Sequence, residues 1–412
     1  MLKAYLVENS LIKNLAALLA GSSTIQVLSL LSVPLLAHFY SPSDFGELSL
    51  LNSMTAIASV IVLLSLDNAY LSETSEDELR RIIQFGSLII IMVIILVPLF
   101  IFIPIPKFIS SKGLTRSILV LIPFSIIMTF LSRFNISIWN REKTYSRISQ
   151  FEVIKKVAII SLQLLIALII SNQNGLVYGL LIGSLVPFLV YGFPVERPVN
   201  IRDLVPRTLQ RQRVFIVDNT LQSALYRLLS EAPVFVITLY MDLSALGIYF
   251  MATRLVQLPG RLAGNSIHRL LMGEYRPADK GRSLMLHFRF TMIIFILAII
   301  FYVFLLVVGE SLVITFLGIE WKSAYDLSLI IFVWTGFTLT SIPSRTYYIA
   351  DRSPKRLLHW DLIVGGARLS TLYLYRHSSL LELMKNYVIV SSVVITTFII
   401  STCLYVRKAQ KS

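Results

Sequence analysis

The chain has 412 residues, of which 56% are hydrophobic and 15% charged, and its mean hydropathy is +0.75. A water-soluble domain does not need so much apolar sequence to fill its core, so this composition excludes an ordinary soluble globule and indicates an integral membrane protein. The formal net charge is +14. Because the basic residues lie in short segments between apolar runs, we attribute this charge to membrane topology and expect no nucleic-acid partner.

Apolar runs fill the chain from end to end, and a helix needs about 20 residues to cross the hydrocarbon of a bilayer. Lipid cannot satisfy free backbone polar groups, and the sequence has no alternating strand pattern, so each run is expected to be a helix. We predict an all-α polytopic membrane protein with about twelve transmembrane helices. The predicted spans, in chain order, are 13–38, 46–67, 82–104, 115–139, 153–171, 175–194, 214–240, 245–270, 287–309, 324–346, 357–376 and 387–406. Prolines within spans, among them Pro187 and Pro343, offer bending points.

The distribution of lysine and arginine predicts the orientation. With twelve spans both termini lie on one side, and that side carries 27 basic residues against six on the opposite side. Basic residues collect on the cytoplasmic side of membrane proteins. Both termini are therefore predicted to be cytoplasmic.

Two pairs of similar segments indicate an internal duplication. "FYSPSDFGEL" at 39–48 resembles "YMDLSALGIY" at 240–249, with an offset of 201, and "IWNREKTYSR" at 138–147 resembles "IADRSPKRLL" at 349–358. Each pair holds the same place in a six-plus-six arrangement, as in parallel-repeat transporters. We predict two pseudo-symmetric six-helix bundles, residues 1–194 and 214–412, joined by a basic cytoplasmic linker at 195–213.

Ionisable residues within spans are costly, so by default they face a protein cavity or pair with one another. Arg254 and Arg261 lie seven residues apart on one face of the eighth span, with no acid in that span to neutralise both. They either line a cavity or, for Arg261, reach the cytoplasmic interface. Arg227 and Glu231 lie four apart in the seventh span and form either an intrahelical ion pair or part of a transport site.

Three further charged residues are candidates. Arg368 lies in the middle of the eleventh span, which is interrupted by two glycines, and Arg133 lies in the cytoplasmic third of the fourth. Asp67 closes the second span, where an interfacial capping role is the alternative to ion coupling. The balance of these residues is basic, which suits an anionic ligand.

No constellation of catalytic residues is visible. The sequence has no phosphate-binding loop, no metal-spaced histidine or cysteine cluster, no nucleophile elbow and no large outward loop. We therefore expect a protein that is not an enzyme and that uses no catalytic residue, cofactor or metal. A membrane-embedded enzyme of polysaccharide assembly is the more distant alternative.

The first span and its turn, "LIKNLAALLAGSSTIQVLSLLSVPLLAHFYSPSDFGELSLLNS", resemble polysaccharide flippases of the MOP superfamily, the Wzx-type O-antigen and capsule translocases. The segment "LSALGIYFMATRLVQLPGRLAG" is similar to the corresponding turn and helix of the second half. The resemblance implies a MATE-like fold of two six-helix bundles around a central cavity.

The resemblance also implies a function. Such a protein moves undecaprenyl-diphosphate-linked oligosaccharide across the bacterial inner membrane by alternating access, driven by a coupling cation, either proton or sodium. Arg254, Arg261, Arg227, Arg368 and Arg133 are then the candidates for binding the diphosphate, and Glu231 and Asp67 are the candidates for ion coupling. Other membrane proteins of polysaccharide assembly are possible partners. The alternative is a cation-coupled multidrug exporter of the same superfamily, for which acidic lumen residues would be expected.

Overall fold

The computed structural model describes residues 24–29, 31–102, 116–170, 174–196, 201–275, 280–351 and 353–411. Within these ranges the chain is helical and contains no β-strand, which agrees with the predicted all-α class. Each predicted span from the second to the twelfth coincides with one helix or with two consecutive helices. The first span overlaps helical residues between 24 and 37, and its earlier part lies outside the described residues.

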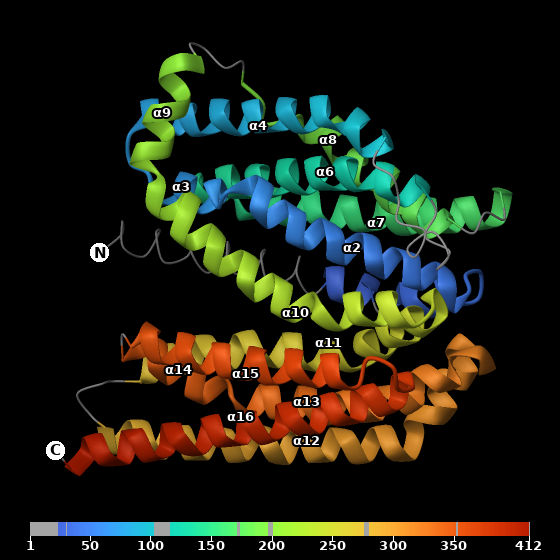
Figure 1. Cartoon of the computed structure of the whole chain (residues 1–412), viewed down its shortest axis with the longest axis vertical. Coiled ribbons are helices and arrows are strands. Elements are labelled where there is room, and N and C mark those ends of the chain that lie inside the picture. The colour runs from blue at the N-terminus through green and yellow to red at the C-terminus, as the bar shows by residue number, and fades with distance from the viewer. Residues whose placement is uncertain are drawn as a thin grey trace, which may run out of the picture. The chain divides into compact units, whose positions relative to one another are not determined.

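The chain divides into two compact units, one ending at Val234 and the other beginning at Phe235 (Figure 1). The first unit contains α2 Pro42–Leu63, α3 Leu66–Ser72, α4 Glu76–Phe102, α6 Arg116–Arg141, α7 Tyr145–Ile170, α8 Gly175–Tyr191, α9 Ile201–Arg211, the π-helix η1 Val214–Asn219 and most of α10 Thr220–Tyr240. The second contains α11 Leu243–Glu274, α12 Lys280–Leu317, the 3-10 helix η2 Ile319–Trp321, α13 Lys322–Thr340, α14 Ile342–Ala350, α15 Pro354–Leu374 and α16 Leu380–Lys411. The bundle limits 1–194 and 214–412 stay a prediction.

Six helical stretches in the described chain are by themselves long and apolar enough to cross a membrane. They are Pro42–Leu63, Glu76–Leu96, Leu121–Arg141, Gly281–Leu317, Ile319–Ala350 and Leu380–Arg407. Together with the shorter apolar helices beside them, they make the chain a multi-pass membrane protein.

The two similar turns each begin a helix. In the first, the backbone N–H and the hydroxyl of Ser41 both donate to the Asp44 carboxylate at 2.8 Å, and Pro42 occupies the first turn of α2. In the second, Asp242 accepts a hydrogen bond from the Ala245 backbone N–H at 2.7 Å and begins α11. Ser41 and Asp242 are both N-cap residues and stand at the same offset of 201 as the sequence similarity.

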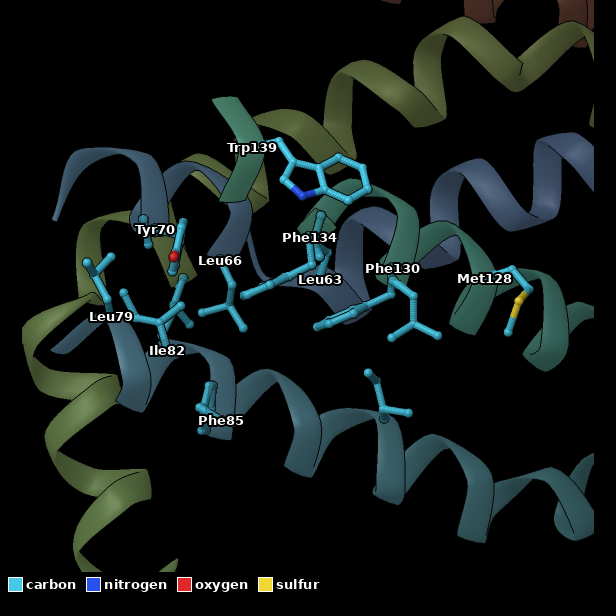
Figure 2. Packing of buried hydrophobic residues seen from close by; sticks show 14 of the residues in the cluster. Leu63, Leu66, Tyr70, Leu79, Ile82, Phe85, Met128, Phe130, Phe134 and Trp139 are labelled. Atoms are coloured by element: carbon cyan, nitrogen blue, oxygen red, sulfur yellow. The ribbon is translucent and has the colours of Figure 1, made fainter. Parts of the chain in front are cut away.

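The core of the first unit is aromatic and aliphatic. Side chains from α3, α4 and α6 meet in one cluster, in which Phe130 and Phe134 stack with ring centroids 5.5 Å apart. Figure 2 shows these rings between the helices, with Ile82 and Phe85 of α4 on one side. Dispersion contacts of this kind hold membrane helices together, because lipid offers no hydrophobic drive between them.

Helices α7 and α8 approach each other through glycines spaced four residues apart. A Cβ added to Gly179 would lie 2.7 Å from the backbone nitrogen of Gln163, and one added to Gly183 would lie 2.5 Å from the Cα of Ile159. The Gln163 amide also donates to the Leu176 carbonyl at 2.8 Å, across the same pair of helices. The contact therefore depends on small residues, as in glycine-mediated membrane helix pairs.

The basic segment after α8 folds onto the first unit. One face of α9 buries Leu204 and Thr208, and the helix packs on α4. The Arg211 guanidinium donates to both carboxylate oxygens of Glu73, at 3.1 and 3.2 Å, and the Gln212 amide adds a third bond at 3.0 Å. These bonds stabilise the charged carboxylate, Arg211 above all, and lower the pKa of Glu73 to about 2.

Candidate functional site

Arg133 and Asp67 form an ion pair within the first unit. Nη2 of Arg133, on α6, lies 2.6 Å from Oδ2 of Asp67, on α3. Asp67 is buried, and its Oδ1 has no hydrogen-bond partner. The sequence proposed these residues for separate roles, and the structure brings them together as one pair.

This pair lies next to a break between α2 and α3. Leu64 and Ser65 both have φ of 51°, in the left-handed region that side chains other than glycine rarely adopt. The Thr220 hydroxyl, directly after the π-helix η1, donates to the Ser65 hydroxyl at 3.2 Å. Two irregular backbone segments thus meet beside Asp67. Strained conformations of this kind concentrate at functional sites.

Glu231 is held by two groups of the first unit. Its Oε2 accepts a hydrogen bond from the buried Ser53 hydroxyl of α2 at 2.7 Å, and its Oε1 lies 3.6 Å from Nη1 of Arg227. Of the two interpretations of Arg227 and Glu231, the intrahelical ion pair is therefore present, extended by a contact between helices. A carboxylate with both a hydroxyl ligand and an arginine counter-charge can exchange one partner for a cation.

Arg254 and Arg261 both lie in α11. The Arg254 guanidinium carbon lies 4.4 Å from the centroid of the Phe250 ring, which is cation–π geometry within one helix. The side chain of Arg261 lies outside the part of the chain that the structure describes.

Arg368 lies on α15 in the second unit and is half-buried. Its guanidinium carbon is 5.2 Å from the ring centroid of Trp334 and 5.9 Å from that of Tyr387, and its Nε donates to the Ser391 hydroxyl at 3.3 Å. Among the described residues no carboxylate lies within ion-pair distance of it. Tyr387 and Ser391 are both buried. The site therefore presents a positive charge surrounded by rings and a hydroxyl.

One buried acid was not among the predicted site residues. Glu47 of α2 is buried, and its Oε2 makes no hydrogen bond. Glu47 lies near the end of "FYSPSDFGEL". An acidic residue at the beginning of a predicted span was therefore the sequence feature that could have identified it. In the described part of the chain no group of three or more histidine, cysteine or carboxylate residues is arranged to hold a metal ion.

A family model for polysaccharide biosynthesis proteins matches residues 35–326. The chain belongs to this family. No curated protein sequence matches the chain.

Solved structures show what fold this family member has. It is similar to an inward-facing multidrug resistance transporter of the MATE family in the MOP superfamily, with a TM-score of 0.71 and 14% identity over 94% of this chain and 96% of that one. It is similar to the lipid II flippase MurJ in an inward closed conformation, with a TM-score of 0.72 and 15% identity over 94% and 89%. A MOP superfamily transporter from Pyrococcus furiosus has a TM-score of 0.59 and 13% identity over 98% and 96%.

These likenesses confirm the predicted fold class, a MOP-type polytopic membrane protein. Together with the family match, they also confirm the resemblance to polysaccharide flippases of the MOP superfamily. This member of the polysaccharide biosynthesis family thus has the fold of MOP-type membrane proteins.

Proposed function

We propose that the protein moves undecaprenyl-diphosphate-linked oligosaccharide repeat units across the bacterial inner membrane, in the biosynthesis of a surface polysaccharide such as O-antigen or capsule. The family match supports the polysaccharide pathway, and the likeness to a lipid II flippase supports a lipid-linked substrate. Movement follows alternating access, with both termini in the cytoplasm. Other membrane proteins of polysaccharide assembly are its expected partners.

The observation that carries this proposal is the environment of Arg368. A half-buried guanidinium within a membrane span is costly unless an anion or water compensates it, and no described carboxylate does so. A diphosphate offers the oxygen geometry that a guanidinium binds best. We assign Arg368 to the diphosphate, together with Arg254 and Arg261 of α11.

Ion coupling is assigned to Glu231, with Asp67 as the second candidate. The Ser53 hydroxyl and the Glu231 carboxylate are hard oxygen ligands, which suits a sodium ion or a proton. For Asp67, the Oδ1 atom has no hydrogen-bond partner and would bind the coupling cation, while Arg133 pairs with Oδ2.

The test begins with deletion of the gene in its native bacterium and complementation with variants. Loss of surface polysaccharide, with undecaprenyl-diphosphate-linked single repeats accumulating on the cytoplasmic leaflet, is the expected result of deletion. We expect Arg368→Gln to lower export at least tenfold, about the value of one charge-assisted bond, and Arg368→Lys to recover part of it. Arg376→Gln is the matched control, because Arg376 also lies over a tyrosine ring, but just beyond the end of α15.

Two outcomes would contradict the proposal. Full export by Arg368→Gln at normal expression would remove Arg368 from the diphosphate site. Intact polysaccharide after deletion, with new sensitivity to cationic drugs, would favour the alternative, a cation-coupled multidrug exporter; the similar MATE family protein is a multidrug resistance transporter.

A further inference from the structure

A basic and aromatic cavity lies within the second unit, away from Arg368. It forms where the end of α14, the first turns of α15 and the last turns of α16 meet, and its volume is about 410 Å³. This volume lies within the range of ligand pockets in proteins. The cavity is lined by Tyr348, Lys355, Arg356, His359, Trp360, Ser401 and Tyr405.

Arg356 is held in place by an aromatic platform. Its guanidinium carbon lies 4.0 Å from the centroid of the Tyr405 ring, and Tyr405 in turn stacks on Tyr348, with centroids 5.9 Å apart and planes at 20°. The Tyr405 hydroxyl donates to Asp351 at 3.2 Å, which fixes the ring. Stacking occupies the face of the guanidinium and leaves its N–H edge free to bind phosphate oxygens.

The charge around the cavity is not compensated by a described acid. No carboxylate of the described chain lies within ion-pair distance of Arg356, and Asp351 is already engaged by Tyr405 and by the Ser353 hydroxyl. Lys355 and Arg356 lie in the first turn of α15, which contains no acidic residue. The helix dipole disfavours cations at that end, so a bound anion would relieve a repulsion that the protein itself leaves in place.

An exposed apolar stripe also runs along α15, on the face next to the one that lines the cavity. Leu358, Leu362 and Leu369 are exposed and lie on one face of the helix, at spacings of four and seven residues. Trp360 and Tyr405 are the ring types that gather at the level of lipid headgroups. A cationic cavity with such rings beside an exposed leucine stripe matches a phosphate headgroup with its acyl chains.

We propose that this cavity binds the headgroup phosphate of an anionic phospholipid, at the end of the protein that the charge distribution predicts to be cytoplasmic. The ligand is a phosphate group, and its source is either a bilayer lipid or free phosphate. The leucine stripe favours the lipid. This site is separate from the proposed diphosphate site and does not depend on what the protein transports.

The test is native mass spectrometry of the full chain in neutral detergent with added dioleoyl phosphatidylglycerol or dioleoyl phosphatidylcholine, which carry the same acyl chains. We expect phosphatidylglycerol to bind at least about tenfold more tightly, and Arg356→Gln to remove that preference. Arg376→Gln is the matched control, because Arg376 also stacks on a tyrosine at 4.0 Å but does not line the cavity. Lys355→Gln provides a second variant if Arg356→Gln melts at a lower temperature than the wild type.

The outcomes separate the alternatives. Loss of the preference in Arg356→Gln or Lys355→Gln, but not in Arg376→Gln, supports the site. Displacement of phosphatidylglycerol by an equal concentration of inorganic phosphate would overturn the lipid as ligand. Equal binding of both lipids to the wild type, or equal losses in the variants and the control, would overturn the site itself.

Discussion

Replacement of Gly183 by alanine should destabilise the first unit, although alanine is the better helix former. The new Cβ would lie 2.5 Å from the Cα and 2.6 Å from the nitrogen of Ile159. Carbon atoms in contact are normally about 3.5–4.0 Å apart. Because both obstructing atoms belong to the backbone, no side-chain rotation can relieve the clash. Helices α7 and α8 must therefore move apart locally by about 1 Å.

The magnitude follows from two opposing terms. A gap of about 0.5–1 Å forfeits a quarter to a half of each dispersion contact along the seam, and overpacking of this kind costs about 1–3 kcal/mol. Replacing a helical glycine by alanine returns about 1 kcal/mol. We expect a net destabilisation of up to about 2 kcal/mol, or up to several degrees in melting temperature.

The control is Gly366→Ala on α15, where a Cβ would meet no atom within 4 Å. Only the propensity term applies at that position, so its melting temperature should equal or exceed that of the wild type. Melting would be followed by size-exclusion chromatography after heating in one detergent. If Gly183→Ala and Gly366→Ala have the same melting temperature, the close-packing argument is refuted.

Four further predictions concern charge and backbone strain. Glu73→Gln should speed amide hydrogen exchange of α9 at pH 7 by about tenfold, since it removes a bidentate charged contact, while Asp77→Asn should not. The pKa of Glu73 is lowered from its usual 4.5 to about 2, so the stability from this contact is complete above about pH 4.5 and is lost as the pH falls towards 2; melting curves across that window should show the loss in the wild type and not in Glu73→Gln. Ser65→Gly should be more stable than Ser65→Ala by about 1 kcal/mol, because both lose the same hydroxyl but only glycine relieves the left-handed backbone; equal melting temperatures would show that the break is unstrained. Arg133→Gln should destabilise by about 1–3 kcal/mol by leaving Asp67 buried and unpaired, and adding Asp67→Asn should restore part of that loss; additive losses would contradict the pairing.

The spans could be predicted because apolar length is a local property of the sequence. Helix breaks within the spans were harder to predict from the sequence. Pro343 coincides with the start of α14, whereas Pro187 lies inside the uninterrupted α8. The break at Leu64 and Ser65 contains neither proline nor glycine, so the sequence gives no signal for it. Its backbone conformation depends on the packing around it and on the hydrogen bond from the Thr220 hydroxyl.

Ion pairs could be predicted from the sequence only where the spacing of the two residues within one helix determines their contact. Arg227 and Glu231 are four apart in one helix, so their contact follows from helical geometry. Arg133 and Asp67 are 66 residues apart, and their contact depends on how α3 packs on α6. The contact of α8 with α7 has its signal in the glycines at 175, 179 and 183, whose spacing of four residues is typical of close membrane helix pairs but was not among the predictions.

The arginines of the predicted spans differ in whether a carboxylate compensates their charge. Arg133 and Arg227 each have a carboxylate within 4 Å, so their charges are already neutralised inside the first unit. Arg368 has only rings and a hydroxyl around it in the described structure. Rings attract a cation by about 0.5–2 kcal/mol, which is well below the several kcal/mol that removing a charge from water costs. Arg368 is half-buried, so its charge is tolerated where water or an anionic ligand reaches its exposed part, and a diphosphate carrier requires an arginine that can accept such a ligand.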